Sequence, residues 1–127
     1  MTEARAAPLV SAHDITKVFD VSAPWLNRVL EGKGRQLLHA VDGISFEIEA
    51  GETLALVGES GCGKSTVARM LVGLYRPSRG RILFDGQDLS SLPQAQAQAQ
   101  RRRMQMIFQD PYASLNPRWK VSEIVAE

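Results

Sequence analysis

Residues 58–66 read GESGCGKST, and this stretch matches the pattern G-x-x-x-x-G-K-[ST] through Gly58, Gly63, Lys64 and Ser65. Small residues in such a loop let backbone N–H groups curl around phosphate oxygens, and the helix that follows turns the positive end of its dipole toward them. The lysine is placed to reach the β and γ phosphates of a nucleotide, and the serine hydroxyl to bind Mg²⁺. We therefore interpret residues 58–66 as a phosphate-binding P-loop.

The sequence on either side predicts the strand and the helix between which a P-loop lies. Residues 53–57 (TLALV) form a near-continuous apolar run, which is typical of a strand covered on both faces. Beyond Lys64, apolar residues recur at the three- and four-residue spacing of a helix, namely Val67, Met70, Leu71 and Leu74. Gly73 and Pro77 then predict the end of this helix.

Other segments predict strands, some of them antiparallel. Residues 10–19 mix β-branched and polar residues, and residues 44–49 alternate so that Ile44, Phe46 and Ile48 should point inward. Asp85-Gly86 favours a type I′ turn, which predicts a short hairpin between residues 81–84 and 87–89. The apolar residues 104–108 predict one more strand.

Three segments depart from this regular pattern. Residues 20–38 contain Pro24, Gly32 and Gly34 without a clear period, so we expect a loop or an insertion there. Residues 93–103 combine the low-complexity run PQAQAQAQ with three arginines, and we expect a short exposed helix. Val121, Ile124 and Val125 begin a helical stripe that stops at Glu127 without a C-terminal cap, as in a truncated chain.

The composition fits one globular domain without a strong charge-driven partner. The 127 residues are 44% hydrophobic, and 15 Lys and Arg balance 14 Asp and Glu, so we expect no nucleic acid partner. The one cysteine cannot form an internal disulfide, which is typical of a reducing compartment. We find no secretory signal and no apolar run of about 18 residues, so we expect a soluble or peripheral protein.

Several single residues invite a functional interpretation that we do not favour. Cys62 has the surroundings of a redox-sensitive thiol, but a small residue tolerated in a variable loop explains it better. Asp85 and Asp110 are both poor matches for the Mg²⁺-binding aspartate that ends an apolar strand in P-loop proteins. The arginines at 101–103 suit a solvated helix end better than a nucleic-acid surface. His13 and His39 are isolated and are not site candidates.

Longer stretches resemble one family. Gln109 stands 45 positions after Lys64 (109 − 64) within MQMIFQDPYASLNPR, and residues 40–66 read AVDGISFEIEAGETLALVGESGCGKST. Together these stretches closely resemble the ATP-binding subunits of ABC transporters. Residues 108–118 (FQDPYASLNPR) and 76–89 (RPSRGRILFDGQDL) resemble the oligopeptide and dipeptide importer branch.

The resemblance implies a fold and a set of site residues. The fold is α/β, the P-loop NTPase core of an ABC nucleotide-binding domain with an antiparallel β subdomain, represented over residues 1–127 by its N-terminal portion through the Q-loop and truncated before the helical subdomain. Phe19 would stack on adenine, although it could equally be a core residue of the first strand. Lys64 and Gln109 would be catalytic, and Ser65 and Gln109 would bind the metal. The nucleotide-binding loop would comprise Gly58, Glu59, Ser60, Gly61, Cys62, Gly63, Lys64, Ser65 and Thr66.

The same resemblance implies a function, with ATP and Mg²⁺ as ligands. The full subunit would couple ATP binding and hydrolysis to peptide import at the cytoplasmic face of the inner membrane, together with transmembrane permease subunits and a second ATP-binding subunit. Residues 110–118 would lie near the surface that docks on the permease. The LSGGQ signature, the Walker B aspartate, the catalytic glutamate and the switch histidine of the family are missing here, so we expect a weak nucleotide binder without turnover. The alternatives are a nonfunctional fragment, whose uncovered apolar strands would favour aggregation, and another P-loop protein such as a small kinase or GTPase.

Overall fold

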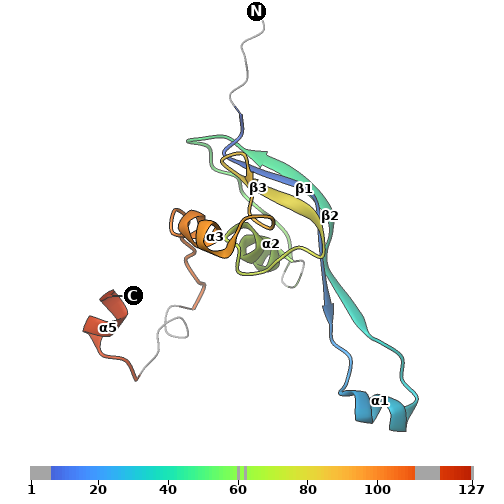
Figure 1. Cartoon of the computed structure of the whole chain (residues 1–127). Coiled ribbons are helices and arrows are strands. Elements are labelled where there is room, and N and C mark those ends of the chain that lie inside the picture. Colours follow the sequence, from blue (N-terminus) through green and yellow to red (C-terminus); the bar gives the residue numbers. More distant parts are fainter. Residues whose placement is uncertain (1–6, 60, 62, 111–117, 127) are drawn as a thin grey trace, which may run out of the picture.

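The computed structural model describes residues 7–59, 61, 63–110 and 118–126. Its elements, in chain order, are β1 (Val10–Asp20), α1 (Trp25–Glu31), β2 (Leu37–Ile48), α2 (Lys64–Leu71), β3 (Arg79–Phe84), β4 (Gln87–Asp88), α3 (Gln94–Arg101) and α5 (Val121–Ala126) (Figure 1). The described part therefore has strands mainly in its first two thirds and short helices between and after them.

The strands form one antiparallel sheet in the order β2-β1-β3-β4. Helix α2 packs on one face of this sheet (Figure 1), and the buried cluster between them joins strand and helix side chains: Ala12, Ile15, Val41, Val67, Met70 and Ile82. The predicted antiparallel β subdomain is confirmed, as is the apolar face of the helix at Val67 and Met70. This packing fixes the N-terminus of α2 relative to β2.

Two strand predictions are confirmed in detail. In β2, Ile44, Phe46 and Ile48 are partly buried and alternate with exposed residues. Asp85 and Gly86 both have positive φ, 53° and 76°, as a type I′ turn requires, and they join β3 to β4. The carboxylate of Asp85 forms an ion pair with Arg103, with 3.1 Å between Nη1 and Oδ2. The guanidinium of Arg103 also lies over the Phe84 ring.

Two predicted strands are wrong. Residues 53–57 and 104–108 have no strand assignment, and several of their side chains are open to solvent: Val57 is 94% exposed and Ile107 96%. A buried strand needs neighbours that accept its backbone hydrogen bonds and cover its two faces. No strand among the described residues pairs with either segment, so the apolar sequence alone does not produce a strand. Their exposure agrees with the expectation of uncovered apolar faces.

The segment 20–38 is more regular than its sequence suggests. Strands β1 and β2 stay paired as far as Asp20 and Leu37, and α1 forms the connection between them. Helix α1 ends at Gly32, which has a left-handed backbone with φ 64°. Strand β2 thus begins at Leu37 rather than at residue 44. Among the described residues, no helix is long and apolar enough to cross a lipid bilayer.

The end of β1 contains a carboxyl group with a shifted pKa. Hydrogen bonding from the side chain and the backbone N–H of Ser22 lowers the pKa of Asp20, and Arg35 and Arg28 lower it further by their charge. Because the pKa of Asp20 is lower in the folded chain than in the unfolded chain, the ionised carboxylate stabilises the fold at pH values above the unfolded pKa. This contribution is lost as the pH falls through the folded pKa. We predict that Ser22→Ala raises the pKa of Asp20 toward its ordinary value in an NMR titration. An unchanged pKa would assign the shift to the Ser22 backbone N–H, which alanine keeps, and to the arginines.

Candidate functional site

The N-terminus of α2 is held against β2 by a close backbone contact at Gly63. This residue has φ 97°, a left-handed conformation, and a Cβ at this position would lie 2.3 Å from the carbonyl oxygen of Ala40. Only glycine avoids both the strained φ and the overlap with the neighbouring strand. Strand β2 and the pattern glycine Gly63 therefore position the first turn of the helix together.

Lys64 turns its side chain back over the loop that precedes it. Its ammonium group donates hydrogen bonds to the backbone carbonyls of Gly58 and Glu59, with a distance of 2.7 Å to the second. Carbonyl oxygens carry only partial negative charge, so phosphate oxygens are stronger acceptors for this ammonium. The sequence-predicted lysine is thus present in the loop and bound to acceptors that a phosphate group can replace.

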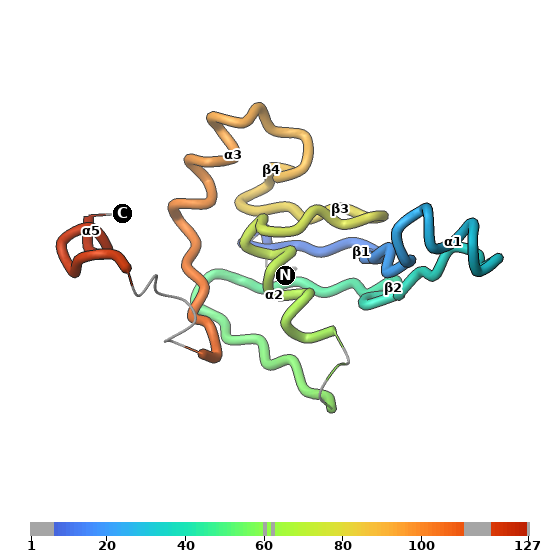
Figure 2. The backbone as a smooth tube through the Cα atoms, turned by 90° about the horizontal axis from the view of Figure 1, so that it is seen from below, coloured from blue at the N-terminus to red at the C-terminus, as the bar shows by residue number. Residues whose placement is uncertain are grey.

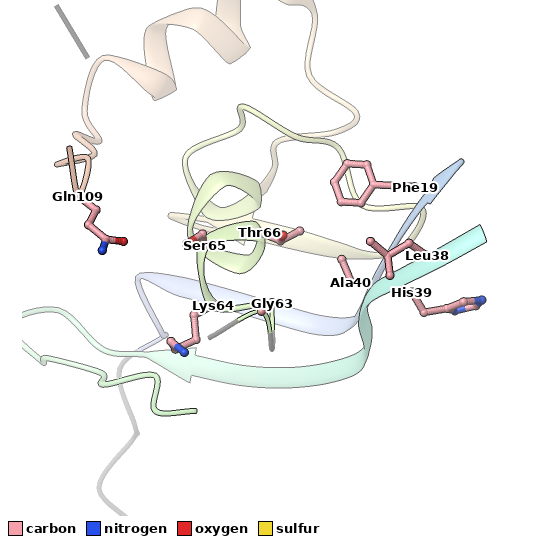
Figure 3. Close-up of a pocket in the computed structure, with 10 residues that line it drawn as sticks. Phe19, Leu38, His39, Ala40, Gly63, Lys64, Ser65, Thr66 and Gln109 are labelled. Atoms are coloured by element: carbon pink, nitrogen blue, oxygen red, sulfur yellow. The ribbon is translucent and has the colours of Figure 1, made fainter. Parts of the chain in front are cut away.

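A pocket of about 500 Å³ lies over the start of α2. Its lining combines the helix start with two strands and with a distant segment: Phe19, Leu38, His39, Ala40, Gly61, Gly63, Lys64, Ser65, Thr66 and Gln109 (Figure 3). The volume lies in the usual range of small-molecule and cofactor sites, about 300–1,000 Å³. In Figure 3, Phe19 and Gln109 lie on opposite sides of the first turn of α2. The fold thus brings predicted residues that are far apart in sequence to one cavity.

Phe19 is part of this lining and also of an aromatic contact outside it. Its ring meets that of Tyr75 edge to face, with 5.5 Å between the centroids. The ammonium of Lys17 lies 5.2 Å from the Phe19 centroid and 5.6 Å from that of Tyr75, and it donates a 2.8 Å hydrogen bond to the Arg76 carbonyl. Phe19 is therefore half-buried and held on one side, while it remains part of the pocket wall.

The pocket also contains neutral oxygen donors suited to a hard cation. Ser65 and Gln109 are both exposed side chains in the lining, and each offers one oxygen. Mg²⁺ in nucleotide sites takes one or two protein oxygens and completes its shell with water and phosphate oxygens. The residues present fit that requirement. Among the described residues, no group of three or more His, Cys, Asp or Glu side chains forms a metal site of its own.

The structure also shows what the sequence prediction misses. Gly58 and Glu59 contribute to the site through their carbonyl contacts with Lys64 rather than as part of the pocket lining. Ser60 and Cys62, and residues 111–117 of the expected docking segment, lie outside the described residues. His39, which the sequence does not indicate as a site residue, belongs to the pocket lining, and in Figure 3 its ring points away from the loop. Its proximity comes from the β1–β2 pairing, for which the local sequence gives no signal.

A glycine loop and a lysine at the start of a helix, packed on an antiparallel sheet, define part of a P-loop nucleotide-binding domain. A family model described as ABC transporter matches residues 41–126. The chain therefore belongs to the ABC transporter family, as its motifs indicate.

Individual relatives narrow the resemblance to one branch. The chain is 45% identical over 119 residues to the probable peptide ABC transporter ATP-binding protein y4tS of Sinorhizobium fredii (strain NBRC 101917 / NGR234), covering 94% of this chain and 32% of the relative. It is 43% identical over 128 residues to the oligopeptide transport ATP-binding protein AppF of Bacillus subtilis (strain 168), covering 100% and 37%. For the dipeptide transport ATP-binding protein DppF of Escherichia coli (strain K12), the identity is 45% and the coverages are 94% and 34%. The resemblance to the oligopeptide and dipeptide branch is confirmed, and the chain spans about a third of the length of these relatives.

Solved structures agree with this fold. A bacterial Atm1-family ABC exporter with ATP bound matches with a TM-score of 0.53 and 35% identity, covering 74% of this chain and 14% of that one. The ATP-binding cassette MJ0796, a dimer bound to ADP and Pi, matches with a TM-score of 0.59 at 24% identity, covering 73% and 35%. The predicted fold class, an ABC nucleotide-binding domain with an antiparallel β subdomain, is confirmed.

Proposed function

We propose that this chain is the nucleotide-binding portion of an ABC importer subunit, and that the whole subunit couples ATP binding and hydrolysis to peptide uptake. The observation that carries the proposal is the pocket that joins Lys64, Ser65, Phe19 and Gln109 at one helix start. The relatives named as peptide transport ATP-binding proteins support the substrate class. Permease subunits, a second ATP-binding subunit and a peripheral place at the cytoplasmic membrane face follow from the same relationship.

Several residues of the pocket have a proposed part in holding the nucleotide. The backbone N–H groups at the start of α2 bind phosphate oxygens, supported by the helix dipole. The Lys64 ammonium exchanges its carbonyl contacts for oxygens of the β and γ phosphates. Phe19 offers a ring face or edge to the base, and its contact with Tyr75 limits the orientations of that ring. These interactions position the triphosphate and leave its terminal group near Gln109.

A bound Mg²⁺ would supply neutralisation of the charge on the phosphate oxygens. Ser65 would hold it from the helix and Gln109 from the segment after α3, since both line the same pocket. Occupancy of the site would therefore affect the position of Gln109 and of the residues that follow it. In the whole subunit those residues are proposed to face the permease.

We further propose that this chain by itself binds nucleotide weakly and does not turn it over. Hydrolysis by P-loop proteins needs a group that activates the attacking water and a partner group that stabilises the transition state. No carboxylate of the described residues lines the pocket, so Gln109 would have to orient the water alone. Asp85 lies in the β3–β4 turn and does not line the pocket, so it does not serve as an activating carboxylate. A nonfunctional fragment is the second candidate, favoured by the solvent exposure of Val57 and Ile107.

Competition binding tests the proposal. A fluorescent ATP analogue is titrated into the chain with Mg²⁺, and ATP, ADP and AMP are added as competitors. We expect ATP and ADP to displace the analogue and AMP to fail, because the pocket binds mainly the β and γ phosphates. Absence of analogue binding from a monodisperse, cooperatively unfolding chain would contradict the proposal. An aggregated chain without binding would favour the nonfunctional fragment.

Phe19 gives a separate prediction about the base. Replacing Phe19 by alanine should weaken ATP binding by about three- to tenfold, because an aromatic contact contributes about 0.5–1.5 kcal/mol. Binding of inorganic tripolyphosphate, which has no base, should not change. Leu38→Ala is a matched control, since Leu38 lines the same pocket and pairs with Phe19 across the sheet. Equal losses for ATP and tripolyphosphate would assign Phe19 to the core of β1 instead.

A further inference from the structure

Helix α1 presents an apolar face that nothing else in the described structure covers. Successive helical residues are about 100° apart. On this spacing Trp25, Leu26, Val29 and Leu30 share one side, while Asn27, Arg28 and Glu31 occupy the other. The apolar side chains are 73%, 54%, 73% and 78% exposed in that order, and α1 buries none of its residues. The helix is amphipathic but has no packing partner among the described residues.

The position of α1 makes this face accessible to a large flat partner. The β1–β2 ribbon extends beyond the part of the sheet that α2 covers, and α1 lies at its far end (Figures 1 and 2). The ribbon is held there by a 3.0 Å hydrogen bond from Val21 N–H to Gln36 O and a 2.8 Å bond from Gln36 N–H to the Ser22 hydroxyl. We name residues 21–37 the hairpin tip. The tip is thus presented at a fixed place on a paired ribbon.

Basic residues lie beside the apolar face. The hairpin tip contains Arg28, Lys33 and Arg35 against one acidic residue, Glu31. The ion pairs of this region are exposed: Lys33 lies 2.9 Å from Glu31, and Arg35 lies 3.8 Å from Asp20. Exposed ion pairs contribute little free energy, so Lys33 and Arg35 can exchange their carboxylate partners for phosphate groups outside the protein. Trp, Leu and Val on one side with Arg and Lys nearby is the pattern of a helix that lies in a membrane interface.

We propose that the hairpin tip binds an anionic lipid bilayer directly, with the apolar face of α1 in the interface and the basic residues on lipid phosphates. The anionic surface of such a bilayer complements the excess of cations in the hairpin tip. Its hydrocarbon accepts the exposed Trp25 and Leu30 side chains without shape-specific contacts. This binding requires neither nucleotide nor permease, so it goes beyond the proposed function. A protein partner in the membrane is the competing occupant, and the experiment separates the two.

The test is sedimentation of the full chain with protein-free vesicles, either phosphatidylcholine alone or with phosphatidylglycerol added. We expect binding to the mixed vesicles, a weaker signal on the neutral ones, and loss with rising salt. In a Trp119→Phe background, the emission of Trp25 should shift to shorter wavelength on binding. Leu30→Glu should lower the vesicle-bound to free ratio by at least about tenfold, because it places a charge on the apolar face.

A matched control separates vesicle binding by the hairpin tip from non-specific adsorption of exposed apolar side chains. Val125 in α5 is 80% exposed, close to the 78% of Leu30, so Val125→Glu adds the same charge at an equally open apolar site. We expect this variant to bind vesicles like the unchanged chain. Equal losses in both variants, no binding to anionic vesicles, or binding only after permease is reconstituted would overturn the proposal. Leu30→Glu should keep the far-UV circular dichroism and the nucleotide affinity of the unchanged chain. A failure of the membrane proposal can therefore be distinguished from a failure of the proposed ATP site.

Discussion

Replacing Lys64 by alanine is expected to weaken ATP binding to this chain by about ten- to hundredfold. A hydrogen bond to a charged group contributes about 1.5–3 kcal/mol, and Lys64 contributes an ammonium group to the pocket lining. Its present acceptors are the carbonyls of Gly58 and Glu59, so its removal also frees the loop backbone. The measurement is the dissociation constant of a fluorescent ATP analogue with Mg²⁺ present.

Lys33→Ala is the control for this prediction. Lys33 pairs with Glu31 at the surface, belongs to the hairpin tip and does not line the pocket. Its replacement should leave the dissociation constant unchanged. If Lys64→Ala binds ATP as well as the unchanged chain does, the nucleotide does not sit at the start of α2. A phosphate-release assay adds a second test, because steady hydrolysis that Lys64→Ala abolishes would refute the proposed lack of turnover.

Local sequence signals predict the backbone and the apolar face at the start of α2 well. The glycine spacing and the apolar positions of α2 act within one loop and one helix, so they need no distant partner to be recognised. The Asp85-Gly86 turn is predicted for the same reason, since the backbone preference resides in the two turn residues. The buried face of α2 and the Asp85-Gly86 turn are confirmed, whereas phosphate binding stays a prediction.

Features that depend on distant pairing are predicted poorly. The apolar residues 53–57 indicate a buried strand, yet a strand forms only where a neighbouring edge accepts its hydrogen bonds. The pocket wall formed by Leu38, His39 and Ala40 arises because β2 pairs with β1 from Leu37 onward. The sequence does not predict helix α1, because seven residues between Pro24 and Gly32 are too few to show a helical period. The long-range pairing that sets these positions leaves no pattern within any one segment.

The fold itself should depend strongly on Gly80, where β3 pairs with β1 across an irregularity in β1. Between the pairs His13–Arg81 and Thr16–Arg79, β1 has one residue more than β3, so β1 bulges there. Gly80 has φ 78°, and a Cβ on it would lie 2.3 Å from the carbonyl oxygen of Asp14 and 2.4 Å from that of His13. Both atoms belong to the backbone of β1, which pairs with β2 and β3 on its two sides, so a shift of either atom would disturb that pairing.

Gly80→Ala should therefore lower the free energy of unfolding by about 2–5 kcal/mol, of which 1–2 comes from the left-handed backbone and the rest from the overlap. Gly86→Ala is the matched control, because Gly86 has nearly the same φ, 76°, with no atom within 4 Å of the added Cβ. That variant should lose only about 1–2 kcal/mol. Urea unfolding followed by circular dichroism measures both. Equal losses would mean that the β1 bulge yields to a methyl group, whereas the larger loss at Gly80 would show that contact between two backbones sets this sheet and, through β2, the position of the loop.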